Sequence, residues 1–169
     1  LLPHLRPDLD AIKVIVKTAL VAGREMLTEL EAKAVLDACR IAIVPTQRVA
    51  GIPDAAALAA QSMGYPVVLK ILSDDISHKS DVGGVALNLQ NESEVHNAAA
   101  TMLERVKHER PEARIQGFTV QSMVKRKHAQ ELIVGSTIDS VFGPVILFGQ
   151  GGTAVEVMAD RAIALPPLN

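Results

Sequence analysis

The chain has 169 residues and a formal charge of −2, and 49% of its residues are hydrophobic while 21% are charged. This composition is typical of a globular protein and argues against a disordered one, and the length allows a core that needs no disulfide or metal. A near-neutral charge and an aromatic content of 2% argue against a nucleic-acid-binding protein. The single cysteine, Cys39, cannot form an internal disulfide and is predicted to be a small core residue.

The sequence predicts neither a membrane span nor a secretory signal. The most hydrophobic stretches are interrupted by lysine and are too short to cross a membrane. Residues 1–10 carry three charged residues and two prolines, unlike a secretory signal. We therefore expect a cytoplasmic protein. Because the chain lacks an initiator Met and stops at the stretch ALPPLN (164–169), we also expect it to be a fragment of a longer protein.

The first part of the chain is predicted to be helical. Residues 1–27 are interpreted as a linker with a short helix. Thr28 is followed three residues later by Glu31, a capping box that predicts a helix ending near Arg40.

Two further helices have clear boundaries. Pro53 begins an alanine-rich helix that ends at Gly64. Asn91 and Glu94 cap the other helix, and Pro111 lies just beyond its end. Hydrophobic residues recur along this second helix at spacings of three and four, namely Val95, Ala98, Ala99, Met102, Leu103 and Val106.

Short runs of β-branched and hydrophobic residues predict strands. These are residues 44–49, 67–72, 82–89, 115–124, 130–138, 143–148 and 153–158. The short polar loop 73–81 predicts that the strands on either side of it pair antiparallel. Because most helices precede most strands, the pattern predicts an α+β fold rather than a regularly alternating parallel sheet.

Lys70 is the first candidate functional residue. In an extended strand it shares a face with Val68 and Leu72, so its ammonium leaves a hydrophobic wall and needs an anionic partner or an escape to water. A lysine that extends to solvent at a sheet edge is the alternative interpretation.

The loop SHKSDVGGV (77–85) is the second candidate. Adjacent glycines allow backbone N–H groups to approach an anion closely, and the serine, histidine and lysine side chains before them add donors. An ordinary hairpin loop with a bulge explains the glycines equally well. His78 could accept a phosphoryl group, since a neutral imidazole is a nucleophile, or it could simply be exposed.

Acidic residues late in the chain form a third group. Glu156 alternates with hydrophobic residues directly after a glycine cluster, and a carboxylate on a buried face needs a cation or several donors. Glu131, at the start of a predicted strand, has a weaker version of the same pattern, and a solvent-facing residue is the alternative. The basic run 125–128 is interpreted as a solvated turn.

Four segments in this order resemble the ATP-grasp part of the NDP-forming acyl-CoA synthetases, a family that includes ADP-forming acetyl-CoA synthetase and, more distantly, the β subunit of succinyl-CoA synthetase. The segments are YPVVLK (65–70), HKSDVGGV (78–85), AQELIVG (129–135) and FGPVILFGQGGTAVEV (142–157). The resemblance covers residues 28–169, and residues 1–27 resemble a linker that leaves CoA-binding and ligase-like domains. The stretches ARIQG (113–117), VQSM (120–123) and LPPLN (165–169) resemble bacterial fusions that also carry a GNAT acetyltransferase domain.

The resemblance implies roles for residues of the first half. Lys70 matches a strand lysine that contacts nucleotide phosphates. The residues that match a small loop closing over the β- and γ-phosphates are Ser80, Asp81, Gly83 and Gly84. His78 matches the histidine of the signature HK-S/T-D-x-GG, which implies either a phosphoryl relay from a phosphohistidine on another domain or a placing of the loop near ATP.

It also implies roles for later residues. The segment that matches a hinge between two sheets, whose backbone reads the adenine edge, consists of Gln121, Ser122, Met123 and Val124. Many ATP-grasp proteins carry glutamate where Gln121 stands. Glu131 and Glu156 match acidic positions near the nucleotide and its metal. The principal Mg²⁺ ligands of the family are expected beyond Asn169, so this piece alone is expected to hold half of a working site.

The resemblance therefore implies an ATP-grasp fragment of an ADP-forming acyl-CoA synthetase, with ATP or ADP and Mg²⁺ as ligands and a phosphohistidine as intermediate. A non-catalytic regulatory part of a GNAT protein-lysine acetyltransferase is the alternative. A carboxylate–amine ligase would share the fold, but no motif for an amine-accepting domain is visible.

Overall fold

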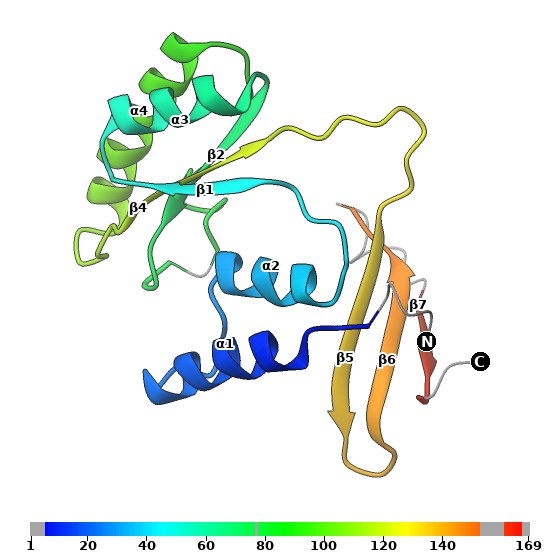
Figure 1. The fold of residues 1–169 in the computed structure, drawn as a ribbon. Helices are drawn as coiled ribbons and strands as arrows, with labels where there is room; N and C mark the ends of the chain where they lie inside the picture. The colour runs from blue at the N-terminus through cyan, green and yellow to red at the C-terminus, as the bar shows by residue number, and fades with distance from the viewer. Residues whose placement is uncertain (1–5, 77, 153–160, 167–169) are drawn as a thin grey trace. The chain divides into compact units, whose positions relative to one another are not determined.

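The computed structural model describes residues 6–76, 78–152 and 161–166. The chain divides into two compact units, Leu1–Val124 and Lys125–Asn169. The elements of the first unit are α1 (Leu9–Val21), α2 (Glu29–Ala38), β1 (Thr46–Val49), α3 (Pro53–Met63), β2 (Val67–Leu72), β3 (Val85–Leu89), α4 (Glu92–Glu109) and β4 (Gly117–Ser122) (Figure 1). Those of the second are β5 (Leu132–Asp139), β6 (Gly143–Gln150) and β7 (Arg161–Ala164).

The predicted caps start their helices. The side chains of Thr28 and Glu31 form the complete capping box at the start of α2. Asn91 accepts a hydrogen bond from the Glu94 N–H at the start of α4. Cys39 is half-buried instead of lying in the core, because it is the C-cap of α2.

The first unit contains a four-stranded antiparallel sheet in the order β1-β4-β2-β3. The predicted antiparallel pairing across the loop 73–81 is confirmed. β3 starts at Val85 rather than at residue 82, because the preceding residues form a turn. In that turn, the Gly83 N–H donates to the Ser80 carbonyl and the Gly84 N–H donates to the Lys79 carbonyl.

The two faces of this sheet differ. One face packs against α3 and α4, and its fully buried residues include Val67, Leu69, Ile71, Phe118 and Val120. The other face carries the alternate residues of the same strands and lies toward α2 (Figure 1). The sheet therefore has one hydrophobic face and one face that is partly polar.

The second unit contains a three-stranded antiparallel sheet in the order β5-β6-β7. Its strands together with the first sheet confirm the predicted α+β class with antiparallel sheets. The β5–β6 turn is closed by Asp139, whose Oδ1 accepts from the N–H groups of Val141 and Phe142 at 2.8 and 2.9 Å. These hydrogen bonds lower the pKa of Asp139. β7 was not predicted from the sequence, and the strand predicted over 153–158 lies outside the described residues.

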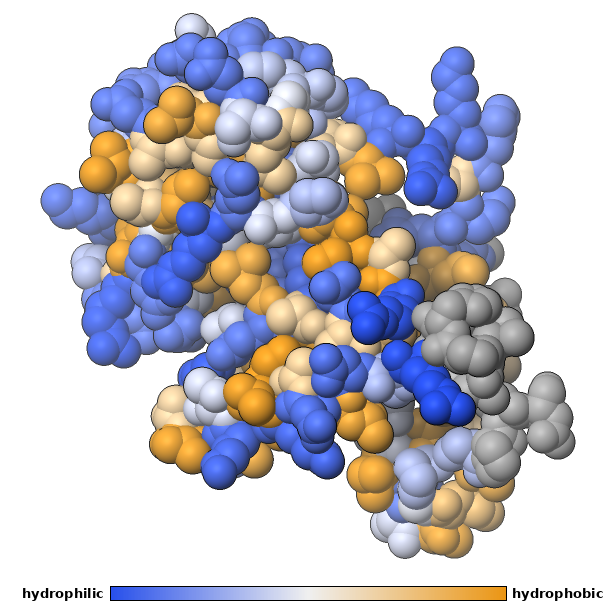
Figure 2. Space-filling view, viewed as in Figure 1, coloured by the Kyte–Doolittle hydropathy of each residue, from blue (hydrophilic) through white to orange (hydrophobic). Residues whose placement is uncertain are grey.

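The surface mixes hydrophilic and hydrophobic residues (Figure 2). Hydrophobic side chains are exposed along α1, where they include Val14, Leu20 and Val21. Within the described ranges, no helix has both the length and the hydrophobicity needed to cross a membrane.

Candidate functional site

Lys70 lies on the α2 side of the sheet, between two buried residues. Val68 and Leu72 are 4% and 7% exposed, while the Lys70 side chain is 22% exposed. Its Nζ donates to Oε1 of Glu29 at 2.6 Å. Of the two predicted alternatives, an anionic partner or an escape to water, the structure shows the anionic partner. It is the carboxylate of Glu29, the first residue of α2.

A second lysine contacts the same carboxylate. Lys33 Nζ lies 3.4 Å from Glu29 Oε1, and it donates to Thr46 Oγ1 at 2.5 Å and to Gln121 Oε1 at 2.9 Å. These contacts tie α2 to β1 and β4. Glu29 and Lys33 were not singled out from the sequence, although an i, i+4 Glu–Lys pair that begins within the capping box was visible as a signal.

The charges around Glu29 favour its ionised form. Partial burial raises the pKa of this carboxyl, but the hydrogen bond from Lys70 and the charges of Lys70 and Lys33 outweigh that effect, so the pKa lies below its ordinary value. Glu29 is therefore an anion between two cations, and the three groups carry a net charge of +1 near neutral pH.

Thr119 adds an unusual polar group to the same face. It lies directly opposite Lys70 in the β2–β4 pairing and is 1% exposed. Its buried Oγ1 has no hydrogen-bond partner within the described part of the chain. Sequence reasoning did not single out this residue, because a threonine in a strand carries no signal of its own.

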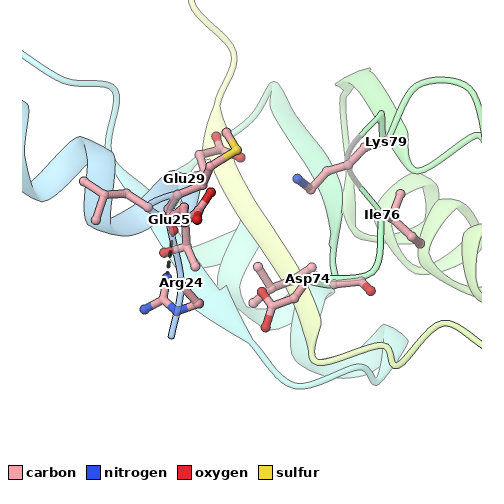
Figure 3. Close-up of a pocket in the computed structure, with 11 residues that line it drawn as sticks. Arg24, Glu25, Glu29, Asp74, Ile76 and Lys79 are labelled. Carbon is pink, nitrogen blue, oxygen red and sulfur yellow. Dashed lines mark hydrogen bonds between the residues drawn. The ribbon is translucent and has the colours of Figure 1, made fainter. Parts of the chain in front are cut away.

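A pocket of about 520 Å³ lies beside this cluster (Figure 3). It is lined by the α1–α2 connection, by the end of β2 and by the loop that follows, with the residues Arg24, Glu25, Met26, Leu27, Thr28, Glu29, Leu72, Ser73, Asp74, Ile76 and Lys79. Lys79 points from the loop into the pocket, and Glu29 lies on the opposite wall (Figure 3). The structure thus brings the lysine of the HKSD segment to the pocket that Glu29 also lines.

The start of this loop is anchored to the segment before β4. Asp74 Oδ2 accepts from Gln116 Nε2 at 2.5 Å, and Asp75 Oδ2 accepts from the Arg114 N–H at 2.8 Å. The contacts with Arg114 lower the pKa of Asp75. The candidate residues His78, Ser80 and Asp81 follow this anchored start and are exposed.

The glycine pair of the loop is packed inward. A Cβ on Gly83 would lie 2.7 Å from the Arg105 side chain of α4, and one on Gly84 would lie 2.6 Å from Ile71 Cγ2. Gly83 also has a φ of +64°, which favours glycine. Because both N–H groups are used by the turn, binding of a phosphate by these two amides requires the turn to open.

The predicted hinge residues lie where the first unit ends. The Met123 N–H donates to the Pro66 carbonyl at 2.9 Å, and Val124, which is exposed, is the last residue of the unit. The Gln121 carbonyl oxygen is held by Lys33. Because lysine can only donate, the Gln121 side chain presents its oxygen to Lys33, and its NH₂ group points the other way.

Two acidic candidates belong to the second unit. Glu131 is exposed, and its backbone carbonyl accepts from the Gly151 N–H at 2.7 Å. Glu156 lies outside the described residues. Among the residues that the structure describes, no three His, Cys, Asp or Glu side chains gather as a metal site would require.

Comparison with known proteins shows the family to which the chain belongs. A family model described as "ATP-grasp domain" matches residues 18–169. The chain belongs to the ATP-grasp domain family, and it corresponds to the ATP-grasp part of the ADP-forming acyl-CoA synthetases.

Two curated relatives illustrate the similarity. ADP-forming acetate–CoA ligase I of Archaeoglobus fulgidus is 42% identical over 98% of this chain, which spans 24% of that protein. The β subunit of the corresponding ligase I of Pyrococcus furiosus is 37% identical over 87% of this chain, which spans 62% of the subunit. The chain thus covers only part of each relative.

The solved structures of acetyl-coenzyme A synthetase 1 from Ca. Korarchaeum cryptofilum share the fold. One, a complex with coenzyme A and Ca-AMPCP, has a TM-score of 0.85 and 38% identity, covering 93% of this chain and 67% of that chain. Another holds coenzyme A and Mg-AMPPCP, and its phosphohistidine segment points towards the nucleotide binding site; its TM-score is 0.75 and its identity 33%, over 94% of this chain and 65% of that one.

Proposed function

We propose that the chain is the nucleotide-binding part of an enzyme that converts acyl-CoA, ADP and phosphate to carboxylate, CoA and ATP, or the reverse, through an acyl phosphate and a phosphohistidine. The observation that carries the proposal is the Lys70 ammonium. It lies on the polar face of the sheet and donates to Glu29, which lines the pocket; among the described residues, Glu29 accepts from one of its three N–H donors. A phosphate oxygen can take the others.

The remaining candidate residues have supporting roles in this proposal. His78, exposed in the loop after β2, receives or steers the transferred phosphoryl group. Lys79, which lines the pocket, adds a cation for the phosphates. Ser80, Asp81 and the glycine pair cover the phosphates after the turn has opened.

The adenine and metal sides of the site are also part of the proposal. Gln121, Met123 and Val124 are proposed to contact the base. On the family resemblance alone, Glu131 is assigned to the nucleotide and Glu156 to the metal. Bound Mg²⁺ would neutralise charge that develops on the transferred group. Its principal ligands are proposed to lie outside this chain.

The complete protein is proposed to be cytoplasmic and to contain CoA-binding and ligase-like domains and a GNAT acetyltransferase domain. The segments 113–117, 120–123 and 165–169 support the last of these. In the alternative function, the ATP-grasp part only regulates the acetyltransferase. Assays of the complete protein separate the two, since acetylation of lysine in protein substrates without any acyl-CoA synthesis would favour the regulator.

Replacement of Lys70 tests the proposal in the complete protein. We expect Lys70→Ala to lower ATP-dependent acyl-CoA formation about 100-fold, because the phosphates lose a cationic donor. Lys13→Ala, which removes an exposed lysine from α1, is the control and should leave the rate unchanged. Equal rates for Lys70→Ala and the wild type would refute the proposed site.

A further inference from the structure

The two lysines that share Glu29 are not equivalent. Lys33 meets three oxygen acceptors, on Glu29, Thr46 and Gln121, which matches the three N–H donors of an ammonium. Within the described ranges, Lys70 meets one acceptor, on Glu29. Lys33 is therefore saturated by protein groups, whereas Lys70 has donors left for a ligand.

Glu29 connects these two lysines through a single oxygen atom. Its Oε1 lies 2.6 Å from Lys70 Nζ and 3.4 Å from Lys33 Nζ. Lys33 also donates to Thr46 of β1 and to Gln121 of β4. Through Lys33, the Glu29 carboxylate of α2 is therefore held in place relative to β1 and β4. A flexible lysine side chain loses conformational entropy when it is ordered. Glu29 imposes that order before any ligand arrives.

We propose that Glu29 is a positioning residue that orients the Lys70 ammonium for the nucleotide phosphates, with Lys33 as its anchor. This inference rests on the proposed function of Lys70. The cluster keeps a net charge of +1 with Glu29 ionised, so the carboxylate orders the lysine without cancelling the attraction of the site for a phosphate. The anion that the ordered ammonium would take is a nucleoside di- or triphosphate.

A double-mutant cycle in the complete protein tests this role, with Mg·ATP binding as the measurement. Glu29→Gln removes the charge and keeps the shape of the side chain. We expect it to raise the Kd of Mg·ATP about tenfold in the wild-type background. This is more than the loss of an exposed ion pair and less than the loss of a fully buried one, because the Lys70–Glu29 pair is partly buried. In a Lys70→Met background the same substitution should change the Kd less than about twofold, since the group that it positions is gone.

The controls separate positioning from folding. Asp37→Asn removes a carboxylate from the exposed surface of the same helix and should leave the Kd unchanged. Glu29→Asp keeps the charge but shortens the side chain by one methylene. The Glu29→Asp variant should lose less affinity for Mg·ATP than the Glu29→Gln variant. It also allows the role of the charge to be tested if Glu29→Gln does not fold.

Three results would overturn the inference. Tighter binding by Glu29→Gln would mean that the carboxylate competes with the phosphates, and unchanged binding would mean that it has no role. An equal loss in both backgrounds would indicate a merely structural contribution. Failure of the proposed function looks different, because the wild-type protein itself would then not bind Mg·ATP.

Discussion

The two faces of the four-stranded sheet are built from the same strands, yet they are stabilised in different ways. On the α3–α4 face, Leu69 and Phe118 are fully buried among other hydrophobic residues. On the α2 face, Lys70 donates to Glu29 of the α2 helix, and Thr119 lies opposite Lys70 in the neighbouring strand. The first face is held by hydrophobic contacts, whereas the second combines the buried side chains of Val68 and Leu72 with the ion pair of Lys70 and Glu29.

This difference separates stability from binding. A hydrophobic face gains free energy from the area it buries and has few groups that a polar ligand could use. A polar face gains little from its ion pairs, because desolvation offsets much of their attraction, but it presents donors at defined positions. We therefore expect substitutions on the two faces to affect different measurements.

The largest expected effect on stability is on the α3–α4 face. Phe118→Ala should lower the free energy of unfolding by about 3–5 kcal/mol, because it removes a fully buried ring and leaves a cavity. Phe142→Ala is the matched control, since that ring is 68% exposed in the β5–β6 turn, and it should change stability by less than about 0.5 kcal/mol. Urea unfolding measures both, and equal losses would contradict the assignment of the core.

A smaller effect is expected at the start of α2. The Arg24 guanidinium binds both carboxylate oxygens of Glu31, at 2.7 and 2.8 Å, and with the Thr28 N–H it lowers the pKa of Glu31 to about 2. Glu31→Gln keeps a capping-box residue but loses the charge. We expect a loss of about 1 kcal/mol near neutral pH.

The pH dependence of this loss follows from the direction of the shift. Because the pKa of Glu31 is lowered from 4.5 to about 2, its contribution is fully present above pH 4.5 and disappears as the pH falls through about 2. Thermal unfolding of the wild type and Glu31→Gln should therefore converge as the solution is acidified over this range. A difference that stays constant with pH would show that the ion pair does not contribute.

The smallest expected effect concerns Thr119 on the α2 face. Thr119→Val replaces a buried hydroxyl that has no partner in the described structure, so it should be neutral or should stabilise the protein by about 1 kcal/mol. Thermal unfolding of the Thr119→Val variant measures the effect on stability, and Mg·ATP binding by the same variant measures the effect on the α2 face. A large loss of stability would mean that the Thr119 hydroxyl forms a hydrogen bond, for example to a buried water, in addition to the described contacts.

Much of the fold was predictable from local patterns. The capping residues Thr28 and Asn91 start helices because their side chains bond to the next turn, which is a local interaction. The alternation around Lys70 correctly predicted a lysine on a buried strand face. By contrast, β7 was missed because four residues near two prolines carry little pattern, and its pairing with β6 is non-local.

The candidate site was only half visible in advance. The motifs with Lys70, His78 and the glycine pair were found from the sequence, and the assigned roles of these residues stay predictions. The inward packing of Gly83 and Gly84 was not foreseen, because it depends on Arg105 of α4 and Ile71 of β2.

By itself, the sequence determined the α+β class, the helix starts and the presence of a lysine in a hydrophobic strand, since each depends on residues a few positions apart. The tertiary structure alone decided that Glu29, 41 residues before Lys70, meets its ammonium, and that Lys33 reaches Gln121 across 88 residues. Electrostatic and hydrogen-bond contacts act over a few ångströms, so their partners are known only once the chain has folded.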